Sequence, residues 1–348
     1  MPVAFADELE LMLTVDYVEN QHGGLREESA VLHNIDLIYS ASSADFGGTG
    51  KGDFYLYVLS NGGDDPSEFI GDTQVTSNIE TTDTTKLYEA WYRQHLRDDL
   101  SVLFGLHDYN SVFATVDNAG LLLNSSFGIG PDIAQVGPSI FSTTALGLVL
   151  SYETATNYVY LAAYDGVPGD PENDHGTQLH IDSGDGIFSA LEWGLFDDNR
   201  YRLSFGFWHL SAQSEAEASA QRSTSQYGSY ALAQTQLGAL ATFIQAGQAK
   251  PQNNTIGAYL GAGFTWPQAF GEFGFGLASA RASRDYRRQR GDIAAHETTL
   301  EISCRFDIGE YLSIQPDFQY VMNPSFEPGI DDAVVTSLRI YLSNEFSL

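Results

Sequence analysis

Cysteine and basic side chains are scarce in this chain, and each scarcity excludes a class of protein. Cys304 is the single cysteine, so an intramolecular disulfide and a cysteine-based metal cluster are excluded. Lysine and arginine number 16 against 46 aspartate and glutamate residues, which gives a formal net charge of -30. Nucleic acid is therefore not an expected partner, because phosphate neutralisation needs clustered basic groups.

Long apolar runs and the common motifs of enzymes are missing as well. No stretch approaches the roughly 18 consecutive apolar residues that a membrane-spanning helix needs. The sequence contains neither HExxH nor GxSxG, and Gly50-Lys51 is followed by Gly52 where a phosphate-binding loop has Ser or Thr. The acidic stretch 165–185 is too irregular for an EF-hand loop. We therefore expect no catalytic residues, no cofactor and no bound metal.

The residues that are abundant favour an ordered β protein. Hydrophobic residues make up 43% of the chain, and the 34 Gly, 19 Tyr and 21 Phe favour strands joined by tight turns. Near the end of the chain, apolar and polar residues alternate with period two, which is typical of strands with one apolar face. The same alternation recurs at residues 9–17, 201–209, 300–306 and 312–322.

Two architectures fit this alternation: a soluble β-sandwich or barrel with the apolar face inside, and a membrane barrel with that face against lipid. Charged side chains in the middle of strands, such as Asp317 and Arg339, suit a wet lumen. The apolar parity also continues to Phe346 and Leu348, as in the closing strand of outer-membrane barrels, although most of those end in an aromatic residue. We therefore predict an all-β transmembrane antiparallel barrel.

Chain length sets the size of this barrel and its domain boundaries. At about 9 to 11 residues per crossing plus connections, the chain suits about 14 to 18 strands, enough to leave an aqueous channel. Ala4-Phe5-Ala6 has the form of a signal-peptidase site. We predict that residues 1–6 are the end of an export signal or a disordered start, and that 7–348 form one barrel domain. Residues 165–186 and 211–225 lack a clear period and are assigned to loops.

Several segments resemble the OprB-type carbohydrate-selective outer-membrane porins. These are LYEAWYRQ at 87–94, GLHDYNSVFA at 105–114, LNSSFGIGPDIAQ at 123–135, PSIFSTTALGL at 138–148, ETTLEISCRF at 297–306, IQPDFQYVMNP at 314–324 and PGIDDAVVTSLRIYL at 328–342. The resemblance implies a sixteen-stranded barrel in the bacterial outer membrane, with loops folded inward to constrict a pore that passes monosaccharides. Members are thought to place arginines at the constriction, whereas five of the 13 arginines here cluster at 281–290.

Candidate residues of a sugar pathway come from parity and from the resemblance. Glu89, Trp91 and Arg93, with His95, share one strand face and offer an aromatic ring between a carboxylate and a guanidinium. The alternative is a structural ion pair with the tryptophan packed beneath a loop. The resemblance places four more residues where an inward loop begins, although loop-capping turn chemistry would also explain them: Asp108, Asn110, Asn124 and Phe127.

A second polar group lies near the end of the chain. Glu297, Glu301 and Arg305 share a parity and, with Asp317 and Gln319 of the next strand, form a predicted ladder in the lumen. A structural network is the favoured interpretation of this ladder. The arginines at 281–290 could bind lipopolysaccharide phosphates or acidic sugars, although such a run is more often a solvated loop tip.

The sequence thus predicts a porin that passes small neutral sugars such as glucose. The alternatives are a general, cation-preferring pore, a secreted carbohydrate-binding β-sandwich, and an outer-membrane phospholipase. His209 and Ser211 lie on one strand side, as in such lipases, but Ala212 stands where Asn is expected. Expected partners are neutral sugars, outer-membrane lipid and lipopolysaccharide, with a homotrimer left open beside a monomer.

Overall fold

The computed structural model is built from sixteen strands. It describes residues 7–44, 51–170, 173–177, 179, 181–182, 184–197, 200–213, 223–269 and 271–347. The strands are β1 (Glu8–Gly24), β2 (Ser29–Ser42), β3 (Gly52–Gly63), β4 (Thr84–Arg97), β5 (Leu100–His107), β6 (Ala145–Glu153), β7 (Asn157–Asp165), β8 (Ile187–Asp197), β9 (Tyr201–Leu210), β10 (Gln226–Leu237), β11 (Leu240–Ala249), β12 (Ile256–Gln268), β13 (Gly271–Ala282), β14 (His296–Ile308), β15 (Leu312–Met322) and β16 (Asp331–Ser347).

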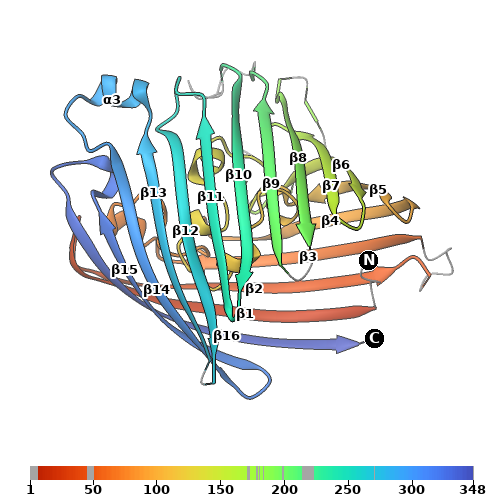
Figure 1. The fold of residues 1–348 in the computed structure, drawn as a ribbon, viewed down its shortest axis with the longest axis horizontal. Coiled ribbons are helices and arrows are strands. Elements are labelled where there is room, and N and C mark those ends of the chain that lie inside the picture. The colour runs from red at the N-terminus through yellow and green to blue at the C-terminus, as the bar shows by residue number, and fades with distance from the viewer. Residues whose placement is uncertain are drawn as a thin grey trace.

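These strands form one closed antiparallel barrel in which every strand pairs with its neighbours in sequence (Figure 1). The barrel closes where β1 pairs with β16, with Glu8 opposite Ser347 and Asp16 opposite Arg339. The predicted all-β fold and the sixteen strands are confirmed, and the closed wall excludes a sandwich. The boundary at residue 7 stays a prediction, because residues 1–6 lie outside the described part of the chain.

The apolar face of the strands points outward. On β1, Leu11 and Tyr17 are exposed whereas Thr14 and Asp16 are buried, and β16 exposes Leu338, Ile340 and Leu342 in the same way. Exposed apolar side chains on one parity with polar ones inside are typical of a barrel that faces lipid. No described helix is long and apolar enough to cross a membrane.

The connections at the two ends of the barrel differ in length. At the end that holds both termini, turns such as those from β10 to β11 and from β14 to β15 are tight, and Gly238 and Gly309 adopt positive φ angles there. The opposite end carries α1 (Ser67–Ile70), α3 (Arg284–Arg290), η4 (Pro324–Phe326) and the long segment between β5 and β6. That segment contains η1 (Tyr109–Ser111), η2 (Asp117–Ala119), η3 (Ser125–Phe127) and α2 (Pro131–Ala134). The segments predicted as loops at 165–186 and 211–225 fall between β7 and β8 and between β9 and β10, except that Asp165 ends β7. Residues 171–172, 178, 180, 183 and 214–222 of these segments lie outside the described part of the chain.

Residues 108–144, which we call the inward loop, fold into the barrel and pack against its inner wall (Figure 1). Tyr109 and Phe127 of this loop are fully buried, and the Phe127 ring lies 5.9 Å from that of Phe243 on β11. The wall makes room for the loop, since a Cβ atom on Gly276 of β13 would lie 2.4 Å from the Phe127 ring. The lumen is therefore partly filled by an apolar, well-packed segment of the chain.

Candidate functional site

The first residue of the inward loop is held by a β-bulge in β4. The register with β3 shifts between Tyr57 and Val58, so that Tyr88 and Glu89 both point into the barrel. Both of these side chains bind Asp108: the Tyr88 hydroxyl donates to Asp108 Oδ2 at 2.6 Å, and Glu89 Oε2 accepts from Asp108 N at 2.9 Å. The bulge therefore supplies two adjacent groups that hold the start of the loop.

The candidate face of β4 is present as predicted. Glu89, Trp91, Arg93 and His95 all point inward. Trp91 donates its Nε1 hydrogen to Glu89 at 3.1 Å and stacks on Tyr55 with ring centroids 4.9 Å apart. The Arg93 guanidinium lies 5.1 Å from the Trp91 ring centroid, within cation–π range. Glu89 and Trp91 are buried, whereas Arg93 and His95 are partly exposed. His95 lies 2.8 Å from the Asp53 carboxyl, so Arg93 is the stronger candidate for contact with the lumen.

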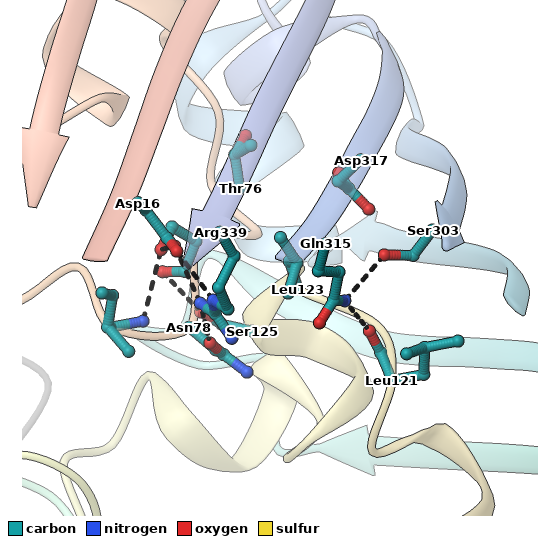
Figure 2. Close-up of polar contacts among 12 residues, drawn as sticks. Asp16, Thr76, Asn78, Leu121, Leu123, Ser125, Ser303, Gln315, Asp317 and Arg339 are labelled. Carbon is teal, nitrogen blue, oxygen red and sulfur yellow. Dashed lines mark hydrogen bonds and ion pairs between the residues drawn. The ribbon is translucent and has the colours of Figure 1, made fainter. Parts of the chain in front are cut away.

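A second group of wall residues holds the middle of the inward loop (Figure 2). Glu301 accepts hydrogen bonds from the backbone N–H groups of Leu123 and Asn124. The Asn124 side chain donates to Gln319 at 3.2 Å. Gln315 donates to the Leu121 carbonyl at 2.6 Å, as Figure 2 shows. A buried carboxylate that accepts two backbone N–H groups is well satisfied, so this contact fixes the loop position.

A shorter loop, residues 64–83, is held in the same manner from the closing strands. Arg339 of β16 binds Asp16 of β1 through two hydrogen bonds of 2.7 and 2.8 Å, and also donates to the Asn78 side chain at 2.7 Å (Figure 2). Asp16 accepts from the Ser77 hydroxyl at 2.7 Å. Glu297 of β14 accepts from the backbone N–H groups of Thr73, Gln74 and Ser325. Both loops are thus held by hydrogen bonds to charged side chains of the barrel wall.

Most of the candidate residues taken from the resemblance and from the predicted ladder help to hold the inward loop in place. Asp108 and Asn124 accept from backbone N–H groups two residues ahead, at Asn110 and Ser126, which is the turn chemistry of loop caps. Phe127 packs in the apolar core. Asp317 binds Gln319 at 3.1 Å beside Glu301. That these residues contact a sugar stays a prediction.

Arg305 is not brought to the rest of the ladder. It binds Glu272 at 3.0 Å and approaches Asp307 at 3.6 Å, near the short-turn end of the barrel. Its side chain remains partly exposed. Glu301, on the same face of β14, binds the backbone of the inward loop instead.

A third anchor, on β8 and β9, was not predicted from the sequence. Glu192 is fully buried and accepts from Ala114 N of the inward loop at 2.8 Å and from the hydroxyl groups of Tyr158 and Tyr230. Arg202 approaches Glu192 at 3.6 Å and Asp117 at 3.4 Å. Strand parity could have found this pair, because Glu192 lies between the outward-facing Leu191 and Trp193.

Two carboxyl groups of the inward loop have perturbed acidity. Burial raises the pKa of Asp108 to about 6, although the hydrogen bond from Tyr88 opposes the shift. Burial raises the pKa of Asp132 in α2 to about 7, and no other described residue donates to either of its carboxyl oxygens. No group of three or more potential metal-ligating side chains lies close enough to hold a metal ion in the described segments.

The fold and this interior define a class of protein. A closed sixteen-stranded barrel that faces lipid, has short turns at one end and is narrowed by loops tied to its charged inner wall has the architecture of outer-membrane porins. A family model described as carbohydrate-selective porin, OprB family, matches residues 26–343. The chain belongs to this family, and the resemblance noted in the sequence is confirmed.

Solved structures of porins share the fold. The high-pH structure of Pseudomonas putida OprB is 18% identical, with a TM-score of 0.84 over 97% of this chain and 94% of that one. The low-pH structure of the same protein is 14% identical, with a TM-score of 0.62 over 97% and 93%. A triple mutant of the Rhodopseudomonas blastica porin is 11% identical, with a TM-score of 0.56 over 98% and 100%. The search of curated proteins found no significant match.

Proposed function

We propose that this sugar-preferring porin passes monosaccharides such as glucose by passive diffusion, and that Arg93 beside Trp91 contacts the sugar. The observation that carries the proposal is the constriction itself, in which wall carboxylates bind the backbone of the inward loop. These carboxylates are satisfied by N–H groups, so they hold the loop rigidly and contribute less free charge to the passage. A rigid, partly aromatic passage with a partly exposed guanidinium suits a neutral polyhydroxylated ring.

Exposure reduces the number of candidate residues that can contact a passing sugar. Of the eleven candidate residues, Arg93, Asp108 and Arg305 combine a charged group with partial exposure. The Asp108 carboxyl is bound by Tyr88 and by Asn110 N, and the buried Glu89 and Glu301 support the loop. We therefore infer a division of roles, in which Arg93 contacts the passing sugar while Glu89 and Glu301 position the wall of the passage. Absence of a cofactor and a metal, assembly as a homotrimer, and contact with lipopolysaccharide are further predictions.

The test is single-channel conductance in a planar bilayer, with glucose added to one side. We expect discrete steps that glucose blocks in a saturable way. Arg93→Gln should weaken the block about tenfold, the effect of losing one charge-assisted hydrogen bond. Arg97→Gln is the matched control, because Arg97 ends the same strand, is exposed and binds only the neighbouring Asp99 among the described residues.

Each other outcome assigns a different function. Steps that glucose leaves unchanged would mean a general diffusion pore, and equal weakening by both variants would remove the role of Arg93. We also infer that no catalytic step occurs. His209 is exposed on the outer wall, and the Ser211 hydroxyl accepts from Ile187 N at 2.8 Å. Ester hydrolysis by the purified protein that is lost in Ser211→Ala would contradict this inference.

A further inference from the structure

On the outer wall of β13 and β14, the side chains change in polarity step by step toward the end of the barrel that carries the longer loops. Successive pairs on this face are Phe275 with Ile302, Leu277 with Leu300, Ser279 with Thr298, and Arg281 with His296. Their neighbours Ala278 and Ala280 are fully buried on the inner side, so these pairs face outward. Each step rises about 7 Å along the strands. The wall therefore runs from apolar to hydroxyl to basic over about 20 Å.

Helix α3 adds further positive charge directly above this face. Its inner side is fixed, because Tyr286 packs on Phe326 with ring centroids 6.3 Å apart and the Ser283 hydroxyl caps Tyr286 N. Arg281 lies directly opposite His296 in the register of β13 with β14, and Arg287 lies one helical turn after Ser283, to whose carbonyl its N–H donates. We call Arg281, Arg287 and His296 the basic rim site.

Carboxylates of this region form ion pairs with other arginines and do not neutralise the charge of the basic rim site. Residues 279–298 hold five arginines against three acidic residues, in a chain whose net charge is -30. Arg288 approaches Asp285 at 3.8 Å and Arg290 binds Glu327 at 2.7 Å. Arg281 and Arg287 have no ion pair among the described residues, and Arg287 Nε is buried without a hydrogen-bond partner. Glu297 points inward and binds loop backbone.

We propose that the basic rim site binds the phosphate group of a lipopolysaccharide headgroup in the outer leaflet. Longer loops mark the extracellular end of outer-membrane barrels, so α3 lies at that leaflet. Guanidinium groups bind phosphate through paired, charge-assisted hydrogen bonds. Below them, the hydroxyl pair of Ser279 and Thr298 matches a sugar headgroup, and the apolar pairs match acyl chains. This order of chemistries along one wall fits an anchored lipid rather than free phosphate.

The proposal is tested by measuring how much lipid A the full-length barrel retains after detergent exchange in buffer without divalent cations. Wild-type protein should retain diphosphorylated lipid A and release the dephosphorylated form. Arg281→Gln/Arg287→Gln should weaken binding about tenfold or more, as expected for the loss of charge-assisted bonds to phosphate. Arg288→Gln/Arg290→Gln is the matched control, because it removes equal charge from the same rim, and we expect binding close to wild type.

Three outcomes would overturn the proposal: equal loss in both double variants, equal retention of the two forms of lipid A, and complete displacement of lipid A by millimolar inorganic phosphate. Heat-modifiable gel mobility checks the folding of each variant. Should the double variant not fold, Arg287→Gln alone and Arg281→Lys/Arg287→Lys provide the same comparison, with the lysine variant expected to recover part of the binding. Glucose block of the channel should stay unchanged throughout, which separates this test from that of the sugar pathway.

Discussion

Asp132 is a buried acid of the inward loop, and no other described residue donates a hydrogen bond to its carboxyl oxygens. Its carboxyl oxygens fit only because two neighbours are glycines, since a Cβ atom on Gly130 or Gly247 would lie within 2.6 Å of them. Burial without compensating donors disfavours the charged form and raises the pKa to about 7. A neutral carboxylic acid is therefore the form that this packing accommodates, and ionisation opposes the docked position of α2 (Pro131–Ala134).

This residue makes the stability of the protein depend on pH. The pKa of Asp132 in the folded protein lies above that of an unfolded aspartate. Its contribution to the free energy of unfolding is therefore fully present below about pH 4 and decreases as pH rises toward 7, by at most about 1.4 kcal/mol per pH unit. Asp132→Asn should remove this part of the decline between pH 4 and 7. Urea unfolding of the reconstituted barrel at several pH values measures it. Identical pH profiles for the variant and the wild type would show that Asp132 does not titrate in this range.

At the scale of elements, wall carboxylates and loop backbone determine the shape of the passage. Glu301 of β14 holds Leu123 and Asn124, whereas Glu272 on the adjacent β13 binds Arg305 and contacts no part of the inward loop among the described residues. The two glutamates thus differ in what they hold, although each lies on the inner wall.

Glu301→Ala should loosen the inward loop. Removal of a buried carboxylate that accepts two backbone N–H groups costs about 2 to 4 kcal/mol, because the donors lose their partner. We expect larger and noisier single-channel conductance and a weaker block by glucose. Glu272→Ala is the comparison, with conductance close to wild type. If the two variants conduct alike, Glu301 does not control the position of the loop.

Strand elements were predictable from sequence, whereas the loop anchors were only partly so. Alternation reveals which residues face inward, and it correctly placed Glu89, Trp91 and Arg93 on one face. The bulge at Tyr88 was not predicted, because neither Tyr88 nor Glu89 is a glycine or a proline, the residues that usually signal a bulge. The partners of Glu301 are backbone N–H groups of a distant segment, and every residue type carries such a group. Sequence patterns therefore indicated the pore wall but not what fills it.

At the scale of the whole molecule, the excess of acidic residues should set ion selectivity. With a net charge of -30, the protein surface has a negative potential that concentrates cations at the pore mouths. We expect reversal potentials in a KCl gradient to show cation preference in dilute salt. The preference should weaken toward 1 M, where the Debye length falls to about 3 Å. Anion preference at low salt would mean that the positive charge of Arg93 and the other inner arginines has more influence on selectivity than the negative charge at the pore mouths.

The bond between Asp16 and Arg339 also orders the events of assembly. One partner lies in the first strand and the other in the last, and together they hold Ser77 and Asn78 of the loop between β3 and β4. This contact cannot exist until the final strand has joined the first. A barrel that has inserted most of its strands could already hold this loop through Glu297, but it would still lack the contacts to Ser77 and Asn78. Closure of the wall is therefore the step that fixes the final position of the loop between β3 and β4.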